Sequence, residues 1–123
     1  CQHFEASQFM FYRRKVDTAG YLVLWQIALA GDRTVSKRFS SLAERQVLLD
    51  LLYDLYPREH EVILYECPTL MTDSVRAEHI PLYELTTATL SQITTLIIPP
   101  ATRLIVNTEV MQKLSNLAPE PIV

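Results

Sequence analysis

Apolar residues gather in three short runs along the chain, and stretches with helical spacing separate these runs. Residues 21–27 form a near-continuous run rich in aromatic and branched side chains, and residues 61–65 and 94–98 form two more. Runs of this length and composition indicate buried strands that are covered on both faces. A partly alternating stretch at 76–85 predicts a further and more exposed strand.

Helices are expected between these strands. Helical spacing over 3–12 predicts an amphipathic helix at the N-terminal end. Ser41 and Glu44 make a capping box, which predicts a second helix that is closed by Pro57. A short helical turn is expected at 87–92.

Two helices have an apolar face that the spacing of their residues defines. The last helix is expected over 109–117, with Thr108 as its N-cap. The residues expected on these faces are Leu48, Leu51, Leu52 and Leu55 in the second helix, and Val110, Met111, Leu114 and Leu117 in the last.

This order of elements predicts an α/β fold in which helices flank a mixed sheet. We expect a connecting helix and linker at 1–20, an α/β domain at 21–118 and a flexible tail at 119–123. The chain opens in mid-structure at Cys1, which favours its being the back half of a larger protein. An enzyme divided in this way can lose its catalytic groups and keep its fold.

Composition narrows the range of partners. The 123 residues suffice for a single core, and a formal net charge of -3 without a basic stripe argues against nucleic-acid binding. No apolar run approaches the roughly 18 residues of a membrane span. Cys1 and Cys67 lie far apart, which predicts free thiols in a reducing, cytoplasmic compartment. The three histidines have no metal-ligand spacing.

The sequence has no nucleophile elbow, no glycine-rich phosphate loop and no carboxylate pair spaced for acid–base work. Three places nevertheless break the local pattern. Gln26 follows Trp25 in a buried strand, so its amide either fastens a neighbouring loop or contacts a ligand. Residues 66–69 follow the carboxyl end of a buried strand, where open α/β sheets bind ligands. Glu5 interrupts an apolar helix, for which a solvated face is the alternative to a site.

Short words of sequence link these places to a known family. Residues 1–9 (CQHFEASQF) and 23–27 (VLWQI) resemble the C-Q-x-(F/Y)-E-A-(S/T)-x segment and the (V/I)-x-W-Q-(V/I) strand of borosin-type peptide α-N-methyltransferases. That family belongs to the tetrapyrrole (corrin/porphyrin) methylase superfamily. Residues 55–62, 81–85 and 94–100 are similar to the superfamily's L-Y-P-x-x-H-x-V, P-L-Y-E-L and T-(S/T)-L-x-(V/I)-P-P words.

The resemblance implies a protein that holds S-adenosylmethionine between two α/β domains, with this chain as the C-terminal domain. The missing N-terminal methylase domain would carry the glycine-rich cofactor loop and the groups that activate the amide, so no catalytic residue is assigned here. Gln8 departs from the pattern, because many borosin sequences have Asp there. The resemblance places Trp25, Gln26, Ala28, Cys67, Pro68, Thr69 and Leu70 at the cofactor, and Gln2 and Glu5 at the domain cleft.

The activity implied is methyl transfer from the sulfonium to a peptide backbone nitrogen, in a homodimer. Because an amide nitrogen is a poor nucleophile, positioning and proton removal must supply much of the acceleration. Two alternatives stay open: a methylase that acts on another class of substrate, such as a tetrapyrrole, and a binding module without catalysis. Residues 119–123 are too short for an attached substrate peptide, so a separate precursor peptide is expected.

Overall fold

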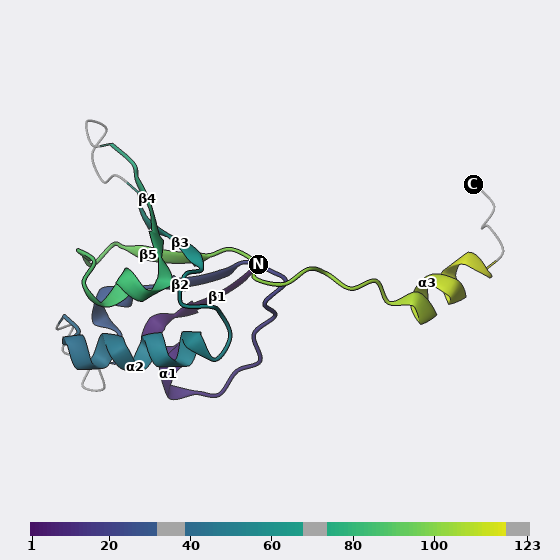
Figure 1. Ribbon diagram of the computed structural model, residues 1–123, viewed down its shortest axis with the longest axis horizontal. Coiled ribbons are helices and arrows are strands. Elements are labelled where there is room, and N and C mark those ends of the chain that lie inside the picture. The colour runs from purple at the N-terminus through teal and green to yellow at the C-terminus, as the bar shows by residue number, and fades with distance from the viewer. Residues whose placement is uncertain (32–38, 68–73, 118–123) are drawn as a thin grey trace.

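The computed structural model describes residues 1–31, 39–67 and 74–117, in which a five-stranded mixed sheet lies against helices (Figure 1). The strand order is β1-β2-β5-β3-β4. The β1–β2 pair is parallel and every other pair is antiparallel, which confirms the predicted α/β class. The elements are β1 (Gln2–Glu5), α1 (Ala6–Phe11), β2 (Leu22–Trp25), the 3-10 helix η1 (Ile27–Leu29), α2 (Leu42–Tyr53), β3 (Glu61–Glu66), β4 (Arg76–Pro81), the 3-10 helix η2 (Leu82–Thr86), β5 (Thr95–Ile98) and α3 (Thr108–Ser115).

The core lies between the helices and one face of the sheet. Leu24 of β2 and Leu64 of β3 both stand opposite Leu96 of β5, and all three side chains are fully buried. Side chains on the opposite face, such as Val23 and Ile97, are only half-buried. Among the described residues α1 and α2 pack on the same face, so for this part of the chain the prediction that the strands are covered on both faces is wrong.

The N-terminal segment differs from the helix predicted over 3–12. Its first part is β1, which joins the sheet as a parallel neighbour of β2, and only Ala6–Phe11 is helical. Phe4 in the strand and Phe9 in the helix still meet in the core, with ring centroids 6.1 Å apart. Phe4 and Phe9 therefore pack together as one apolar face would, but Phe4 belongs to a strand and Phe9 to a helix. Glu5 makes that boundary, because its side chain caps α1 at the Ser7 N–H.

The helix predicted after Ser41 is confirmed, with a different buried face. The Glu44 N–H donates to Ser41 Oγ over 3.2 Å and the Ser41 N–H donates to Glu44 Oε1 over 3.0 Å, so both halves of the capping box form. The helix ends at Tyr53, four residues before Pro57. Its buried residues are Leu48, Leu49 and Leu52, whereas Leu51 is 37% exposed and Leu55 lies beyond the helix.

The second half of the chain follows the predicted order with shifted boundaries. The strands expected at 61–65 and 94–98 are confirmed as β3 and β5. The exposed strand ends at Pro81, and the short helical turn is η2 at Leu82–Thr86 rather than at 87–92. The N-cap of α3 is Asn107, whose side chain accepts the Val110 N–H, and not Thr108.

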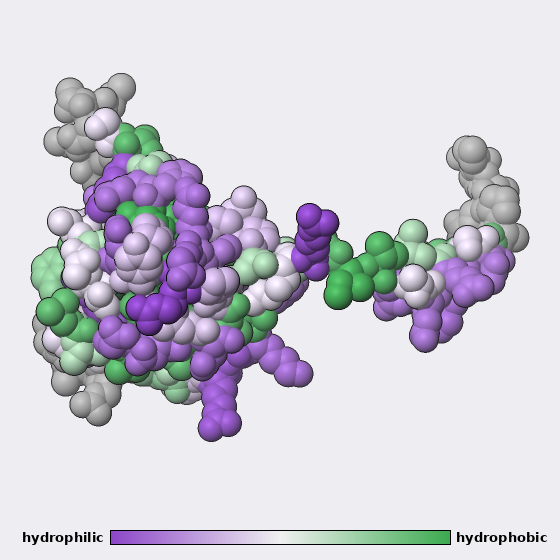
Figure 2. All heavy atoms as spheres, in the orientation of Figure 1, coloured by the Kyte–Doolittle hydropathy of each residue, from purple (hydrophilic) through white to green (hydrophobic). Residues whose placement is uncertain are grey.

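The C-terminal helix α3 projects away from the sheet at the end of an extended segment (Figure 1). Figure 2 shows hydrophobic residues along that segment and on the helix. The apolar face predicted for α3 is exposed throughout, as is the segment before it. Within residues 1–31, 39–67 and 74–117 no helix is both long and apolar enough to cross a bilayer.

Leu51 and Leu52 provide a test of which face of α2 is buried. Leu52→Ala is expected to lower the free energy of unfolding by about 2–5 kcal/mol, because Leu52 is 0% exposed and its loss leaves a cavity. Leu51→Ala, the matched control, should cost less than about 1 kcal/mol. Urea titrations followed by circular dichroism measure both values. Equal losses would contradict the observed orientation of the helix.

Candidate functional site

The sheet topology brings the carboxyl ends of three strands to one edge. The β1 and β2 strands are parallel, and β5 is antiparallel to both β2 and β3, so β1, β2 and β3 run in the same direction. They end at Glu5, Trp25 and Glu66. Ligands of open α/β sheets bind outside the carboxyl ends of strands. This edge is therefore the candidate functional site.

Glu5, Trp25 and Gln26 line one hollow of about 440 Å³ at this edge. Glu5 comes from the end of β1, whereas Trp25 and Gln26 are consecutive at the end of β2. The family resemblance implied the cofactor for Trp25 and Gln26 and the domain cleft for Glu5. Parallel pairing explains their approach, because Glu5 and Trp25 are partners in the β1–β2 register. The remaining residues that line the hollow are His3, Phe4, Gln8 and Arg14.

Arg14 was not predicted as a site residue. Its guanidinium carbon lies 4.4 Å from the centroid of the Phe4 ring, a distance typical of a cation–π contact. The side chain is exposed, and no ion pair to a described acidic residue holds it. The hollow thus presents a cation at its rim. The sequence showed only a basic triplet, and nothing in it indicated that Phe4 would orient the middle residue.

Gln26 adopts an unusual backbone conformation. Its φ and ψ of 57° and 40° place it in the left-handed region, where it is the only described residue other than glycine with positive φ. Such strain costs about 1–3 kcal/mol and gathers at functional sites. The strand ends at Trp25, so Gln26 is exposed and the premise that it is a buried amide is wrong. Its side chain has no hydrogen bond to another described residue.

Trp25 and Glu5 complete the polar and aromatic wall. Trp25 is 42% exposed, so part of its indole is open to a ligand. The Glu5 carboxylate accepts the Ser7 N–H over 3.1 Å, which fixes it at the start of α1. The hollow therefore offers a flat apolar surface, an exposed amide, a carboxylate and a guanidinium within one small region.

Gln2 and Ala28 do not line the hollow. Gln2 lies at the other end of β1, where its amide donates to the Asp17 carbonyl over 3.0 Å and accepts the Asp17 N–H over 2.8 Å. It thereby fastens the segment that joins α1 to β2. Ala28 is fully buried in η1, and its carbonyl accepts the Ser40 N–H over 2.7 Å.

The end of β3 carries a second polar cluster at the same edge. The Glu66 carboxylate accepts a hydrogen bond from Arg76 over 2.8 Å and one from Thr94 over 2.9 Å. Burial opposes ionisation of Glu66, but these hydrogen bonds outweigh it and lower the pKa of the carboxyl below its ordinary value. Cys67 follows as an exposed free thiol. The predicted contacts Pro68, Thr69 and Leu70 lie outside the described residues.

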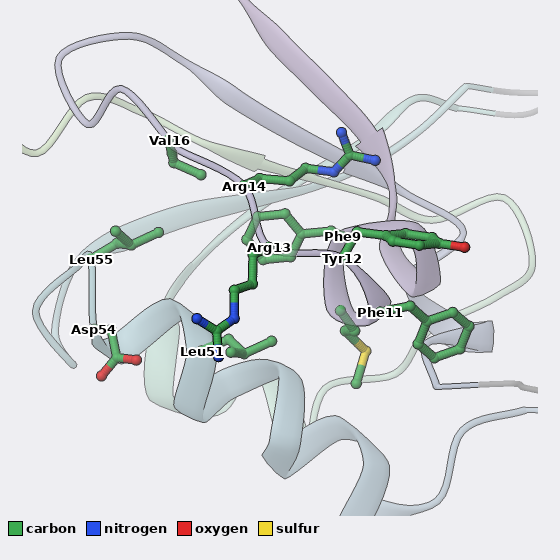
Figure 3. A pocket seen from close by; sticks show the side chains of 10 residues that line it. Phe9, Phe11, Tyr12, Arg13, Arg14, Val16, Leu51, Asp54 and Leu55 are labelled. Atoms are coloured by element: carbon green, nitrogen blue, oxygen red, sulfur yellow. The ribbon is translucent and has the colours of Figure 1, made fainter.

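A larger hollow of about 530 Å³ lies between α2 and the segment that begins in α1. Its walls combine apolar side chains with the charges of Arg13, Arg14 and Asp54, and Figure 3 shows the side chains that line it. None of the predicted site residues lines it, and Arg14 is the residue that it shares with the smaller hollow. The parts of the chain that the structure describes hold no group of three or more metal-ligating side chains.

Comparison with known proteins gives one distant relationship. No family model matches the chain. The chain is 28% identical over 128 residues to a methyltransferase/ribosomally synthesized cyclic peptide gymnopeptides precursor, gymMA1, of Gymnopus fusipes. The match covers 99% of this chain and 30% of that protein, so the chain spans less than a third of the relative's length. This similarity supports a distant methyltransferase relationship, and membership of the tetrapyrrole methylase superfamily stays a prediction.

Replacing Gln26 by glycine tests the strain at the hollow. Gln26→Gly is expected to raise the free energy of unfolding by about 1 kcal/mol, because glycine adopts positive φ without steric cost. Gln46→Gly in α2 is the control, and it should lower stability by about 1 kcal/mol, because glycine is unfavourable inside a helix. Urea titration distinguishes the signs. A loss in both variants would contradict the strain.

Glu66 makes stability depend on pH. Glu66→Gln should cost about 1–3 kcal/mol near pH 7, where the ionised carboxylate accepts its hydrogen bonds. Because the folded-state pKa is lowered, this contribution is complete above the unfolded pKa of about 4.3 and disappears as pH falls through the lower folded value. Urea titrations at several pH values should show the difference from wild type shrinking in acid. Glu59→Gln, at an exposed position, should change stability little at any pH.

Proposed function

We propose that this chain forms one wall of an S-adenosylmethionine site in a methyltransferase that methylates a peptide backbone nitrogen. The observation that carries the proposal is the convergence of Glu5, Trp25 and Gln26 in one hollow at the carboxyl ends of parallel strands. The distant similarity to a methyltransferase that is also a cyclic peptide precursor supports the reaction class and the substrate class.

The groups in the hollow suit the chemistry of this cofactor. S-adenosylmethionine supplies an electrophilic methyl group on a sulfonium, together with a flat adenine and a charged amino-acid end. The exposed indole of Trp25 is suited to an aromatic ring or to a cation, and the exposed amide of Gln26 can both donate and accept hydrogen bonds. Arg14 and Glu5 provide one charge of each sign at the rim. These residues would bind and orient the cofactor.

The groups that act on the peptide are expected in another domain. Within the described ranges the hollow contains Glu5 as its one carboxylate, and that oxygen already accepts a hydrogen bond from Ser7. The relative is more than three times as long as the matched region, which leaves room for a second domain. We propose that an N-terminal methylase domain closes the edge of the sheet. Exposed apolar side chains beside the larger hollow, Phe11, Tyr12 and Leu51, provide it with a surface to pack on.

The remaining partners follow from the same proposal. A peptide would enter between the two domains, and the whole protein would act as a homodimer in the cytoplasm. The name of the relative joins a methyltransferase and a precursor in one protein, so an attached substrate is proposed alongside the separate precursor peptide. The second candidate function is a binding module without catalysis, because the same hollow can hold a ligand in a chain that lacks the amide-activating groups.

Trp25→Ala tests the cofactor site in the longer protein that contains this chain. Loss of stacking is expected to weaken S-adenosylmethionine binding by about tenfold to a hundredfold, measured by calorimetric titration. The control is Tyr83→Ala, which removes an aromatic side chain that is 45% exposed in η2, away from the hollow.

Three outcomes separate the hypotheses. Weaker binding in the Trp25 variant alone, together with transfer of a methyl group to a peptide detected by mass spectrometry, supports the proposal. Binding without transfer to any peptide favours the binding module. Equal affinities in the wild type and both variants would overturn the assignment of the hollow.

A further inference from the structure

Ser7 is a buried polar side chain behind the hollow. It is 6% exposed, and its hydroxyl donates to the Leu29 carbonyl over 3.1 Å and accepts the Gly31 N–H over 3.0 Å. Both hydrogen-bonding roles of the hydroxyl are therefore filled by one short segment of backbone. That segment is the end of η1, which begins directly after the strained Gln26.

The segment from Gln26 to Gly31 transmits a constraint from one end to the other. Within it, the Leu29 N–H donates to the Gln26 carbonyl over 3.0 Å and the Ala30 N–H donates to the Ile27 carbonyl over 3.2 Å. Its apolar side chains are buried in the core. A displacement at the Ser7 contact must therefore rotate the whole turn, and with it the backbone that carries Gln26 and the neighbouring Trp25.

Strained conformations persist only where the surrounding contacts hold them. Two serines hold this turn. Ser40 binds the Ala28 carbonyl through its N–H and the Ala30 carbonyl through its hydroxyl, over 2.7 and 2.6 Å. Ser7 holds the far end, where Gly31 adopts a φ of 87° that residues with a side chain rarely adopt, and where a Cβ would lie 3.0 Å from Glu44 Oε2.

Ser7 also connects the two walls of the hollow. Its N–H donates to the carboxylate of Glu5, which lines the hollow from β1. Its hydroxyl holds the turn that supplies Gln26 from β2. The spacing between the two walls thus depends on a residue that does not itself line the hollow.

From this geometry we infer that Ser7 is a positioning residue, which sets the orientation of Trp25 and Gln26 and thereby the affinity of the hollow for its ligand. The effect on affinity rests on the proposed function, and the effect on Trp25 does not. Removing the hydroxyl frees the Gly31 N–H and the Leu29 carbonyl, and the turn loses the contact that opposes relaxation of Gln26.

Tryptophan fluorescence tests the positioning directly, because Trp25 is the single tryptophan of the 123-residue chain. Ser7→Ala is expected to increase quenching of Trp25 by acrylamide and to shift its emission, since the indole gains freedom. Ser7→Thr keeps the hydroxyl and should retain the wild-type signal. The matched control is Thr94→Val, which also removes a buried hydroxyl. The Thr94 side chain is 0% exposed, and its hydroxyl donates to the carboxylate of Glu66 rather than to the turn after Gln26.

The affinity is measured in the longer protein by calorimetric titration with S-adenosylmethionine. Ser7→Ala is expected to weaken binding by about tenfold, as is usual for residues that orient a ligand-binding group, and Thr94→Val should not reproduce the change in Trp25. Unchanged Trp25 quenching in Ser7→Ala, or an equal change in Thr94→Val, overturns the inference. A changed Trp25 signal in a protein whose wild type does not bind S-adenosylmethionine supports the positioning role and overturns the proposed function.

Discussion

The insertion of β5 between β2 and β3 is the constraint on which the rest of the molecule depends. Leu96 of β5 stands opposite Leu24 and Leu64, and burial of this row ties together strands that lie far apart in the sequence. Because β5 is antiparallel to both neighbours, β2 and β3 must run in the same direction. Their carboxyl ends then meet at one edge with that of β1. The position of the candidate site is thus a consequence of packing in the core.

The two faces and the edge of the sheet differ in burial and polarity. One face is fully used by the core, while Val23, Ile63 and Ile97 on the other face remain half-buried. The edge with the carboxyl ends carries exposed polar and aromatic groups, and α3 presents an apolar face to solvent. Exposed apolar surface of this kind is suited to contacts with another domain or another protein.

The elements that were predicted correctly depend on residues that lie close together in the sequence. The capping box at Ser41 involves residues three apart. The apolar runs of β3 and β5 can be recognised as strands without knowing which strands they pair with. Errors arose where distant segments decide the outcome. The strand β1 exists because β2 is available to pair with it, and the buried face of α2 depends on which leucines meet the sheet. Glu5, Trp25 and Gln26 were all named from the sequence, and the fold brings them to one hollow, whereas the place of Arg14 depends on a contact with Phe4 that no spacing reveals.

Three consecutive residues at the start of α1 show why a short sequence motif can be informative about a site. Glu5 caps the helix and lines the hollow, Ala6 is fully buried beneath the sheet, and Ser7 holds the turn behind Gln26. Each side chain meets a different requirement: a charge at a helix N-terminus, a small volume in the core, and a hydroxyl with two backbone partners. The strand–helix corner thus combines all three requirements in three consecutive residues, and Ser7 is the one that contacts the turn after Gln26.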